Sequence, residues 1–443
     1  MKMTMKPSTM RVVGIAFVAC VLLLASWTAV VAAALVRPPS FVLDLDKPPL
    51  HRWDGAVGAV VSRHGWWNSI GAVYKKYEPR FALMPPFLVS ILEGIVQDRF
   101  PNEYQELLGL CQQMINAATA AGVPNATQYN VTTMLPWVFF YEFGDLSTSE
   151  YHKMSTLTEE SFWRDMKRFQ AHGGDADGKA HRRHVARAVA ARTERHAFPR
   201  ACTGILSLPQ LDATADTIHG RNMDEQPKEG RNCTLNITVT KGGQVLYHIF
   251  DWMWMTTGFF TGSRRNAVTL EMNWRDHSQI NLLEIMARLM TPTTMPTLWM
   301  YRTILEQGLD FESAVSNLNT TVFAAPFYAI MSGTGRRGAV ITTFFNNSDN
   351  VIDFVNDASE KPYMVQTNYD RWLPDPPSDP RRTVAEDTLA MELPSRAGSL
   401  LGVWMAASVF PVHNQDTMYT VLLSVSAPPE GYIRTDMIPD KKK

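Results

Sequence analysis

The stretch from Arg200 to Glu225, RACTGILSLPQLDATADTIHGRNMDE, constrains the fold more than any other part of the chain. It contains an apolar run from Thr203 to Leu208, a turn-prone segment, and a second run that begins at Thr217. This pattern predicts a strand, a turn and a second strand, with Cys202 at the first residue of the hairpin. A thiol at a strand edge, with a cation and a carboxylate brought back beside it, is one way to build a nucleophile. A buried structural cysteine near an ordinary ion pair is the alternative.

The remaining hydrophobic patterns predict a mixed helix and strand protein. Apolar residues recur at helical spacing from Trp66 to about Val123, and the pattern becomes strand-rich after Cys202. Residues 38–60 are expected to be extended, and residues 134–144 to form a buried aromatic segment. Further strands are predicted over 235–239, 245–250, 267–272, 327–332, 339–345, 351–355, 363–367 and 419–426, and helices over 280–290, 298–309, 311–318, 383–391 and 400–409. Strands in hairpins with helices in separate blocks favour antiparallel sheets layered with helices.

Residues from about 147 to 200 are predicted to form a basic, flexible insertion, because they contain few large apolar residues. Its histidines lack paired cysteines or carboxylates at ligand spacing, so no metal site is expected at His172, His181, His184 and His196. A solvated linker and a patch for anionic lipids both fit this composition.

The N-terminus points to the secretory pathway. Lys2, Lys6 and Arg11 precede an uncharged run from Val12 to Val36, which fits a cleaved signal peptide or a retained signal anchor within residues 1–37. The expected locations are the lysosome, the secretory pathway or the extracellular space. Six glycosylation sequons agree with this, at Asn125, Asn130, Asn232, Asn236, Asn319 and Asn346.

Charge, cysteines and motifs exclude several classes of function. The net charge of −1 gives no argument for a nucleic-acid partner.

Outside the leader the chain has three cysteines, Cys111, Cys202 and Cys233, so they cannot all pair within the chain. A Cys111–Cys233 bridge would leave Cys202 free, although the pairing stays open. The segment 333–338, GTGRRG, precedes β-branched residues and predicts a turn between strands instead of a dinucleotide loop. The chain has no Walker loop, H-E-x-x-H or G-x-S-x-G motif.

A second polar cluster, Gln366 to Trp372, follows a predicted strand and precedes a proline-rich loop. An asparagine at a strand end, such as Asn368, is suited to donate to a developing oxyanion. The same residue type also satisfies the backbone of its own turn.

Taken together, these segments resemble the ordered signatures of the acid ceramidase and N-acylethanolamine acid amidase family, N-terminal nucleophile cysteine hydrolases, and are most similar to acid ceramidase. The similarity extends from about residue 38 to residue 433, interrupted by the basic insertion. The segments that carry it are Leu43–Trp53, Cys202-Thr203, His219–Asp224, Gln366–Trp372 and Arg381–Thr383.

The resemblance implies an α+β fold, the αββα sandwich, with a helical α portion over residues 38–201 and a catalytic β portion over 202–443. It implies that the chain cuts itself between Ala201 and Cys202 to give an α/β heterodimer. The Cys202 thiol would attack the Ala201 carbonyl, and water would open the resulting thioester. The freed α-amine, with a reference pKa of about 8, would then act as base to its own thiol.

Carried over by position, Cys202 is the expected nucleophile and Asn368 the oxyanion donor. Asp224 would orient the new α-amine, Arg221 would position the cysteine and the substrate carbonyl, and Arg381 would support the site. The implied partners are a lipid amide and a membrane surface with anionic lipids, with no cofactor, metal or nucleic acid.

Ceramide, cleaved to sphingosine and fatty acid, is the expected substrate, because Met223 and Arg371 match the ceramidase forms of their motifs. N-acylethanolamine is the alternative. Trp274 stands where the family usually has Glu, and Glu225 stands where it usually has an aromatic residue. These departures favour an alternative of another class, a catalytically silent, membrane-anchored lipid-binding glycoprotein on the same scaffold.

Overall fold

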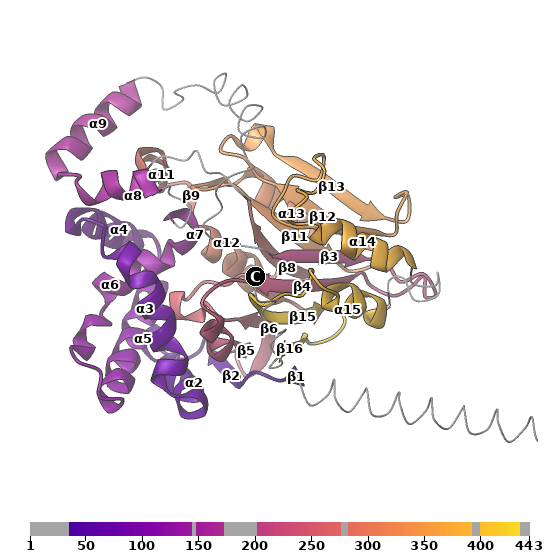
Figure 1. Cartoon of the computed structure of the whole chain (residues 1–443), viewed down its shortest axis with the longest axis horizontal. Coiled ribbons are helices and arrows are strands. Elements are labelled where there is room, and N and C mark those ends of the chain that lie inside the picture. Colours follow the sequence, from indigo (N-terminus) through magenta and orange to yellow (C-terminus); the bar gives the residue numbers. More distant parts are fainter. Residues whose placement is uncertain (1–34, 144–147, 172–201, 276–281, 392–398, 435–443) are drawn as a thin grey trace, which may run out of the picture.

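The computed structural model describes residues 35–143, 148–171, 202–275, 282–391 and 399–434. Residues 1–34 of the expected leader, Ala201 and the four histidines of the basic segment lie outside the described residues. Within the described ranges the strands form an eight-stranded sheet, a six-stranded sheet and a small two-stranded sheet. The two large sheets lie face to face, with helices on their outer faces (Figure 1). The fold is therefore the α+β, αββα sandwich that the sequence predicts.

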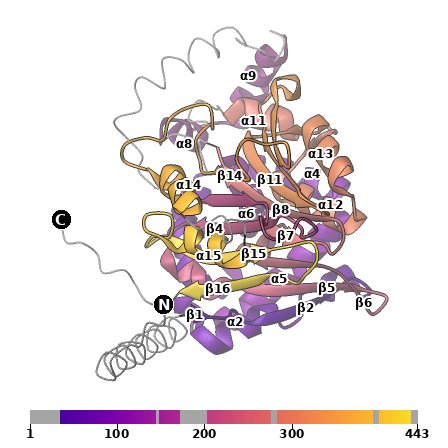
Figure 2. The ribbon, with the colours of Figure 1, turned by 90° about the vertical axis from the view of Figure 1, so that its right-hand side faces the viewer.

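The six-stranded sheet carries the hairpin that contains the cysteine. Its order is β1-β16-β15-β4-β3-β14, and every neighbouring pair is antiparallel. Helices α14 and α15 cover its outer face (Figure 2). The bounds are β1 Leu35–Val36, β3 Thr203–Ser207, β4 Ile218–Asp224, β14 Tyr363–Gln366, β15 Thr417–Leu423, β16 Glu430–Arg434, α14 Arg381–Met391 and α15 Leu400–Ser408.

The eight-stranded sheet has the order β13-β12-β11-β8-β7-β6-β5-β2, in which β2 and β5 are the one parallel pair of this sheet as described. Helices α12 and α13 pack on its outer face. The bounds are β2 Ser40–Asp44, β5 Leu235–Lys241, β6 Gln244–Asp251, β7 Thr261–Ser263, β8 Val268–Trp274, β11 Phe327–Gly333, β12 Arg337–Thr342, β13 Val351–Asn356, α11 Leu282–Leu289, α12 Thr297–Gln307 and α13 Phe311–Thr320, with β9 Thr294–Met295 and β10 Val322–Phe323 in the small sheet.

Strand β4 directs alternate side chains to opposite faces of its sheet, because successive residues of a strand point in opposite directions. His219 points between the two sheets, where its Nε2 lies 2.9 Å from Oε2 of Glu271 on β8. Asn222 points to the helical layer and donates to the Ala407 carbonyl of α15 at 2.6 Å. Every residue of β4 is buried, so its polar residues are held between packed layers on both sides.

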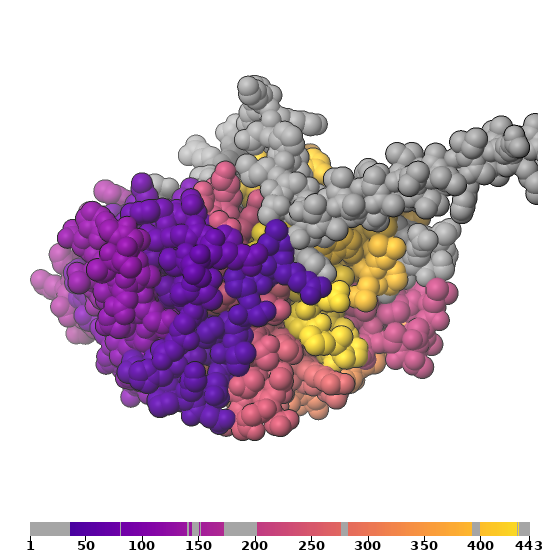
Figure 3. Space-filling view, turned by 90° about the horizontal axis from the view of Figure 1, so that it is seen from below, coloured from indigo at the N-terminus to yellow at the C-terminus, as the bar shows by residue number. Residues whose placement is uncertain are grey.

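Apart from β1 and β2, most described residues before Cys202 form helices beside the sheets (Figure 1), and these indigo to magenta residues fill one side of the molecule in the space-filling view (Figure 3). Its core is aromatic: the Trp137 ring contacts the rings of Tyr74, Tyr77 and Phe81. The helices are α2 Ala56–His64, α3 Ile70–Phe81, α4 Pro86–Arg99, α5 Pro101–Ala120, α6 Val131–Val138, α7 Phe140–Phe143, α8 Thr148–Ser155 and α9 Glu159–Ala171. Helices α6 and α7 contain the buried aromatic segment expected over 134–144.

Three local predictions are wrong. Residues 38–60 are extended only in β2, and helix α2 begins at Ala56. The expected last strand, 419–426, ends at Leu423, and β16 follows it. Residues 148–171 of the expected flexible insertion form α8 and α9, because Phe162 and Met166, four residues apart, bury one face of α9.

The cysteines form no disulfide in the described part of the chain. Cys111, Cys202 and Cys233 are all free and buried, so the Cys111–Cys233 bridge considered from sequence is not present.

Candidate active site

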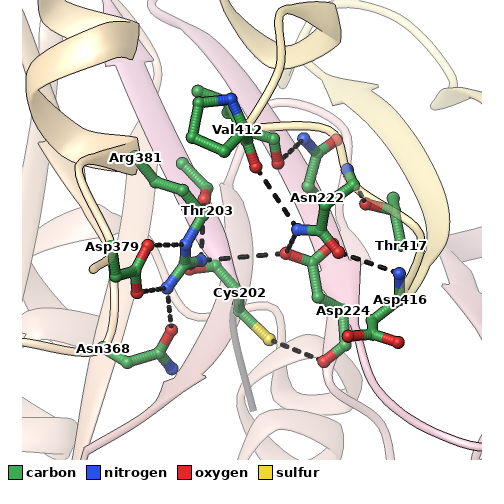
Figure 4. A network of polar contacts seen from close by, with 12 residues as sticks. Cys202, Thr203, Asn222, Asp224, Asn368, Asp379, Arg381, Val412, Asp416 and Thr417 are labelled. Carbon is green, nitrogen blue, oxygen red and sulfur yellow. Dashed lines mark hydrogen bonds and ion pairs between the residues drawn. The ribbon is translucent and has the colours of Figure 1, made fainter. Parts of the chain in front are cut away.

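The β3–β4 hairpin brings Cys202 next to Arg221 and Asp224. Antiparallel pairing places Thr203 opposite Asn222 and Gly204 opposite Arg221. Cys202 immediately precedes β3, and its Sγ lies 3.8 Å from Arg221 Nη2 and 4.0 Å from the Asp224 carbonyl oxygen. The hairpin therefore brings the Cys202 sulfur to the Arg221 guanidinium and to the backbone of Asp224, and Figure 4 shows Cys202 beside Asp224.

The thiol of Cys202 is buried, with 5% of its surface exposed. Burial raises the pKa of Cys202 to about 11, although the nearby positive charge of Arg221 opposes that increase. The thiol is therefore protonated at physiological pH, and a base is needed to make it a nucleophile.

Arg221 reaches the sulfur from between the two sheets. Its Nη1 donates to the Phe260 carbonyl at 2.8 Å, and its Nη2 donates to the Met223 sulfur at 2.8 Å. Asp251 accepts hydrogen bonds from the Met253 and Phe260 backbone amides, so it fixes the loop that supplies this carbonyl. Sequence analysis missed Asp251, because only the folded loop brings it near Arg221.

Asp224 is fully buried on the opposite face of β4. Its Oδ2 accepts from Asn414 at 3.0 Å and lies 3.7 Å from Arg381, whereas Oδ1 has no hydrogen-bond partner among the described residues. Burial raises the pKa of Asp224 to about 7, and Arg381 and Asn414 only partly oppose this shift. The unpartnered oxygen is able to accept from a nitrogen introduced nearby.

Arg381, at the start of α14, links the two polar clusters predicted from sequence (Figure 4). Its Nη1 donates to the Cys202 carbonyl at 2.8 Å, and its Nη2 donates to Asn368 Oδ1 at 3.0 Å. Asp379 holds the guanidinium through two bonds, at 2.6 and 2.7 Å. Asp379 was also missed, although its position two residues before a predicted site arginine is a signal that could have revealed it.

Asn368 follows β14 and is almost fully buried. Its Nδ2 donates to the Trp274 carbonyl at 2.8 Å, while its Oδ1 accepts from Arg381. These two bonds fix the orientation of the amide, and the second N–H of Nδ2 remains as a further donor by the chemistry of the group. The structure therefore brings Cys202, Arg221, Asp224, Asn368 and Arg381 together; Ala201 lies outside the described residues.

The two departures from the family pattern lie at the boundary with the helical portion. Glu225 Oε1 accepts from the Tyr77 hydroxyl of α3 at 3.1 Å. The Trp274 ring packs against Tyr141 of α7, with centroids 4.5 Å apart. Glu225 thus has a structural partner, which the sequence did not reveal because Tyr77 lies 148 residues away.

The asparagines of the six predicted glycosylation sequons are all exposed or partly exposed. Asn125, Asn130 and Asn346 are exposed, and Asn232, Asn236 and Asn319 are partly exposed. The described residues contain no group of three or more His, Cys, Asp or Glu side chains arranged to hold a metal ion. No helix in the described ranges is long and apolar enough to cross a membrane.

Comparison with known proteins finds N-acylethanolamine-hydrolyzing acid amidases and acid ceramidases. N-acylethanolamine-hydrolyzing acid amidase of Oryctolagus cuniculus is 30% identical over 231 residues, or 51% of this chain and 62% of the relative. Acid ceramidase of Homo sapiens is 29% identical over 242 residues, or 51% of this chain and 60% of the relative. Over about half of its length, the chain is therefore similar to acid ceramidases and N-acylethanolamine acid amidases.

The match covers about three fifths of the length of these curated relatives. No protein-family model matches the chain. Among solved structures, a Caenorhabditis elegans N-acylethanolamine-hydrolyzing acid amidase ortholog matches 51% of this chain and 94% of its own, with 25% identity and a TM-score of 0.45.

Proposed function

We propose that this protein is a lipid amidohydrolase that first cuts its own chain before Cys202 and then hydrolyses the amide bond of ceramide. The observation that carries the proposal is the arrangement at Cys202. Arg221 lies at its sulfur, Arg381 donates to its carbonyl, and the buried Asp224 carboxylate has an unpartnered oxygen.

Self-cleavage would proceed through a thioester. The Cys202 sulfur forms a bond to the Ala201 carbonyl carbon, the peptide C–N bond breaks, and the nitrogen takes a proton to become the α-amine of Cys202. Water then adds to the thioester carbon and the C–S bond breaks. The products are a carboxylate at Ala201 and a free thiol at Cys202.

The new α-amine supplies the base that the site otherwise lacks. Its reference pKa of about 8 leaves a fraction of the amine unprotonated near neutral pH, and the amine lies on the same residue as the thiol. We assign Asp224 Oδ1 to orient this amine, because that oxygen is buried and unpartnered in the described structure.

Turnover would then use the same groups in order. The α-amine takes the thiol proton, the sulfur attacks the acyl carbon, and Asn368 Nδ2 stabilises the oxyanion. The protonated α-amine donates to the leaving nitrogen, which departs as sphingosine. Water hydrolyses the acyl thioester, releases the fatty acid and restores the thiol.

N-acylethanolamine is the second candidate substrate. Met223, a ceramidase-like residue, has its sulfur 3.5 Å from Cys202, which supports a role at the site. Arg371 instead bonds to Gln366 and Asp353, so it supports the Gln366–Trp372 segment. The amidase relative is slightly more similar in sequence than the ceramidase relative, at 30% against 29% identity, which favours the alternative.

The decisive experiment follows purified full-length protein at acidic pH by intact mass and N-terminal sequencing. Wild type is expected to yield a fragment that begins at Cys202, whereas Cys202→Ala stays whole. Cleaved protein is then assayed with ceramide and with N-acylethanolamine. Equal or faster turnover of N-acylethanolamine would reverse the substrate assignment.

The same experiment tests the catalytically silent lipid-binding alternative, which predicts a single uncleaved chain without turnover. Trp274, whose apolar ring packs beside the Asn368 contact, is the feature that supports this alternative. We further propose a secreted or lysosomal, glycosylated α/β heterodimer that acts at membranes with anionic lipids. The solvent-accessible sequons and the buried contacts of Glu106 and Tyr77 across the boundary support it.

A further inference from the structure

A polar cluster lies between the two sheets, next to the candidate site. It comprises His219 of β4, Thr269 and Glu271 of β8, and Ser332 of β11, and none of them has exposed surface. The His219 ring is held by Thr269 Oγ1 at 2.7 Å and by Glu271 Oε2 at 2.9 Å, and Ser332 Oγ lies 2.7 Å from Thr269 Oγ1. The proposed reaction uses none of these groups.

One oxygen of the Glu271 carboxylate remains unused. Oε1 has no hydrogen-bond partner in the described part of the chain. It is also the nearest atom to the position that a methyl group on Gly204 would occupy. Gly204 pairs with Arg221 in the β3–β4 register, so the carboxylate lies against the pair of residues that carries the site arginine.

Arg221, which carries the opposite charge to Glu271, also has a buried polar atom without a hydrogen-bond partner in the described part of the chain. Its Nε has no partner, and its Nη atoms contact a carbonyl and two sulfur atoms. None of the ion pairs found among the described residues includes Arg221. A buried guanidinium without a counter-charge is strongly unfavourable, and the low dielectric between the sheets makes a nearby carboxylate effective.

Glu271 is the best placed of the nearby charges. Burial alone lowers the pKa of Arg221, but nearby Tyr419 and Glu271 outweigh this and raise it. Burial raises the pKa of Tyr419 well above 10, so that phenol is neutral. Asp251 also contributes, but burial raises its pKa to about 6, so it is largely protonated in acid.

We propose that Glu271, held by His219, is a positioning residue that acts through Arg221. Its carboxylate is the counter-charge that keeps the guanidinium directed at Cys202 Sγ, so that Arg221 stabilises the thiolate. The inference rests on the proposed function, because it assigns a purpose to the same cysteine. It also makes a claim about thiol reactivity that holds whether or not the protein hydrolyses lipids.

The test compares Glu271→Gln with a matched control, Ser332→Ala. Gln keeps the shape and an acceptor for His219 but removes the charge, whereas Ser332→Ala removes an uncharged hydroxyl of the same cluster that contacts Thr269. Alkylation of Cys202 by iodoacetamide at pH 8 is followed by peptide mass spectrometry, which separates Cys202 from Cys111 and Cys233. Self-cleavage rate and melting temperature are measured on the same samples.

Glu271→Gln is expected to slow both alkylation and self-cleavage by about 10-fold, with Ser332→Ala within about twofold of wild type. Removal of the negative charge alone would lower the pKa of Cys202 and speed alkylation, because Glu271 is among the charges that raise that pKa after burial. Alkylation of Glu271→Gln as fast as or faster than wild type would therefore overturn the inference.

Two further variants complete the design. In an Arg221→Lys background, Glu271→Gln should change alkylation by less than about twofold, since the effect is transmitted through Arg221; a full 10-fold loss there would contradict the inference. Glu271→Asp keeps the charge and should fall between wild type and Glu271→Gln, and it serves alone if Glu271→Gln does not fold. A wild type that neither cuts itself nor hydrolyses lipid refutes the proposed function, while the alkylation comparison still decides the role of Glu271.

Discussion

Glu106 of α5 and Arg302 of α12 form a buried ion pair across the boundary between the two portions of the chain. Both Nη atoms of Arg302 donate to the carboxylate at 2.7 Å, and Arg52 and Trp53 donate to it at 2.9 and 2.8 Å. Glu106 lies before Cys202 and Arg302 lies after it, so cleavage at Cys202 would leave this pair connecting two separate fragments.

We predict that Glu106→Gln destabilises the protein by about 3–5 kcal/mol, because it removes the fully buried carboxylate and leaves Arg302 with only the partly exposed Glu306 as counter-charge. The free energy of unfolding is measured by urea denaturation in a Cys202→Ala background, which keeps the chain whole. Glu386→Gln is the control: it breaks a solvent-exposed 2.7 Å pair with Lys361 and should cost less than about 1 kcal/mol. Similar losses for both variants would contradict the role assigned to Glu106.

Asp224→Asn is predicted to increase stability at pH 8 while lowering turnover. Burial raises the pKa of Asp224 from 3.8 to about 7, so between these values the native state binds more protons than the unfolded state. The contribution of Asp224 to stability is therefore full in acid and is lost as pH rises toward 7. Asn removes this dependence, so the variant should match wild type at pH 4 and exceed it by about 1–4 kcal/mol at pH 8, while turnover falls at least ~10-fold.

Glu142→Gln is predicted to change the pH profile of stability in the same direction without affecting turnover. Burial also raises the pKa of Glu142 to about 7, although the Thr297 backbone amide donates to its Oε1 at 2.8 Å and opposes the shift. Its contribution likewise disappears as pH rises toward 7. Melting curves from pH 4 to pH 8 should flatten relative to wild type for both variants. A loss of turnover in Glu142→Gln equal to that in Asp224→Asn would show that pH sensitivity, and not the position of Asp224, controls activity.

The sequence predicted the site best where its residues are local or follow strong patterns. The apolar run from Thr203 to Leu208, the turn-prone segment and the second run from Thr217 predicted the hairpin and the return of Arg221 beside Cys202, whereas the register is known only from the fold. Asn368 was a candidate from its place at a strand end, but its meeting with the hairpin, and the role of Arg381, required the family resemblance, because 144 or more positions separate these residues from Asp224.

Other features depend on tertiary contacts that no local pattern contains. Glu271 became recognisable only when β8 was placed against the hairpin. Helix α2 contains three valines and a glycine, which disfavour a helix locally, yet the burial of Val57 and Val60 favours it in the fold. Strand β7 has only three residues, too few for a periodic signal.

Gly204→Ala provides a last prediction, because it displaces Glu271 without changing its charge. A methyl group at this position would collide with the Glu271 carboxylate and with Ile330. Since His219 holds that carboxylate, the substitution should cost about 1–3 kcal/mol and slow Cys202 alkylation as Glu271→Gln does. Gly220→Ala is the matched control: its methyl group would meet Val403 on the other face of the same sheet, at a similar cost in stability but with unchanged alkylation. Equal slowing by both variants would mean that general strain in the hairpin, and not the place of the Glu271 carboxylate, controls the reactivity of Cys202.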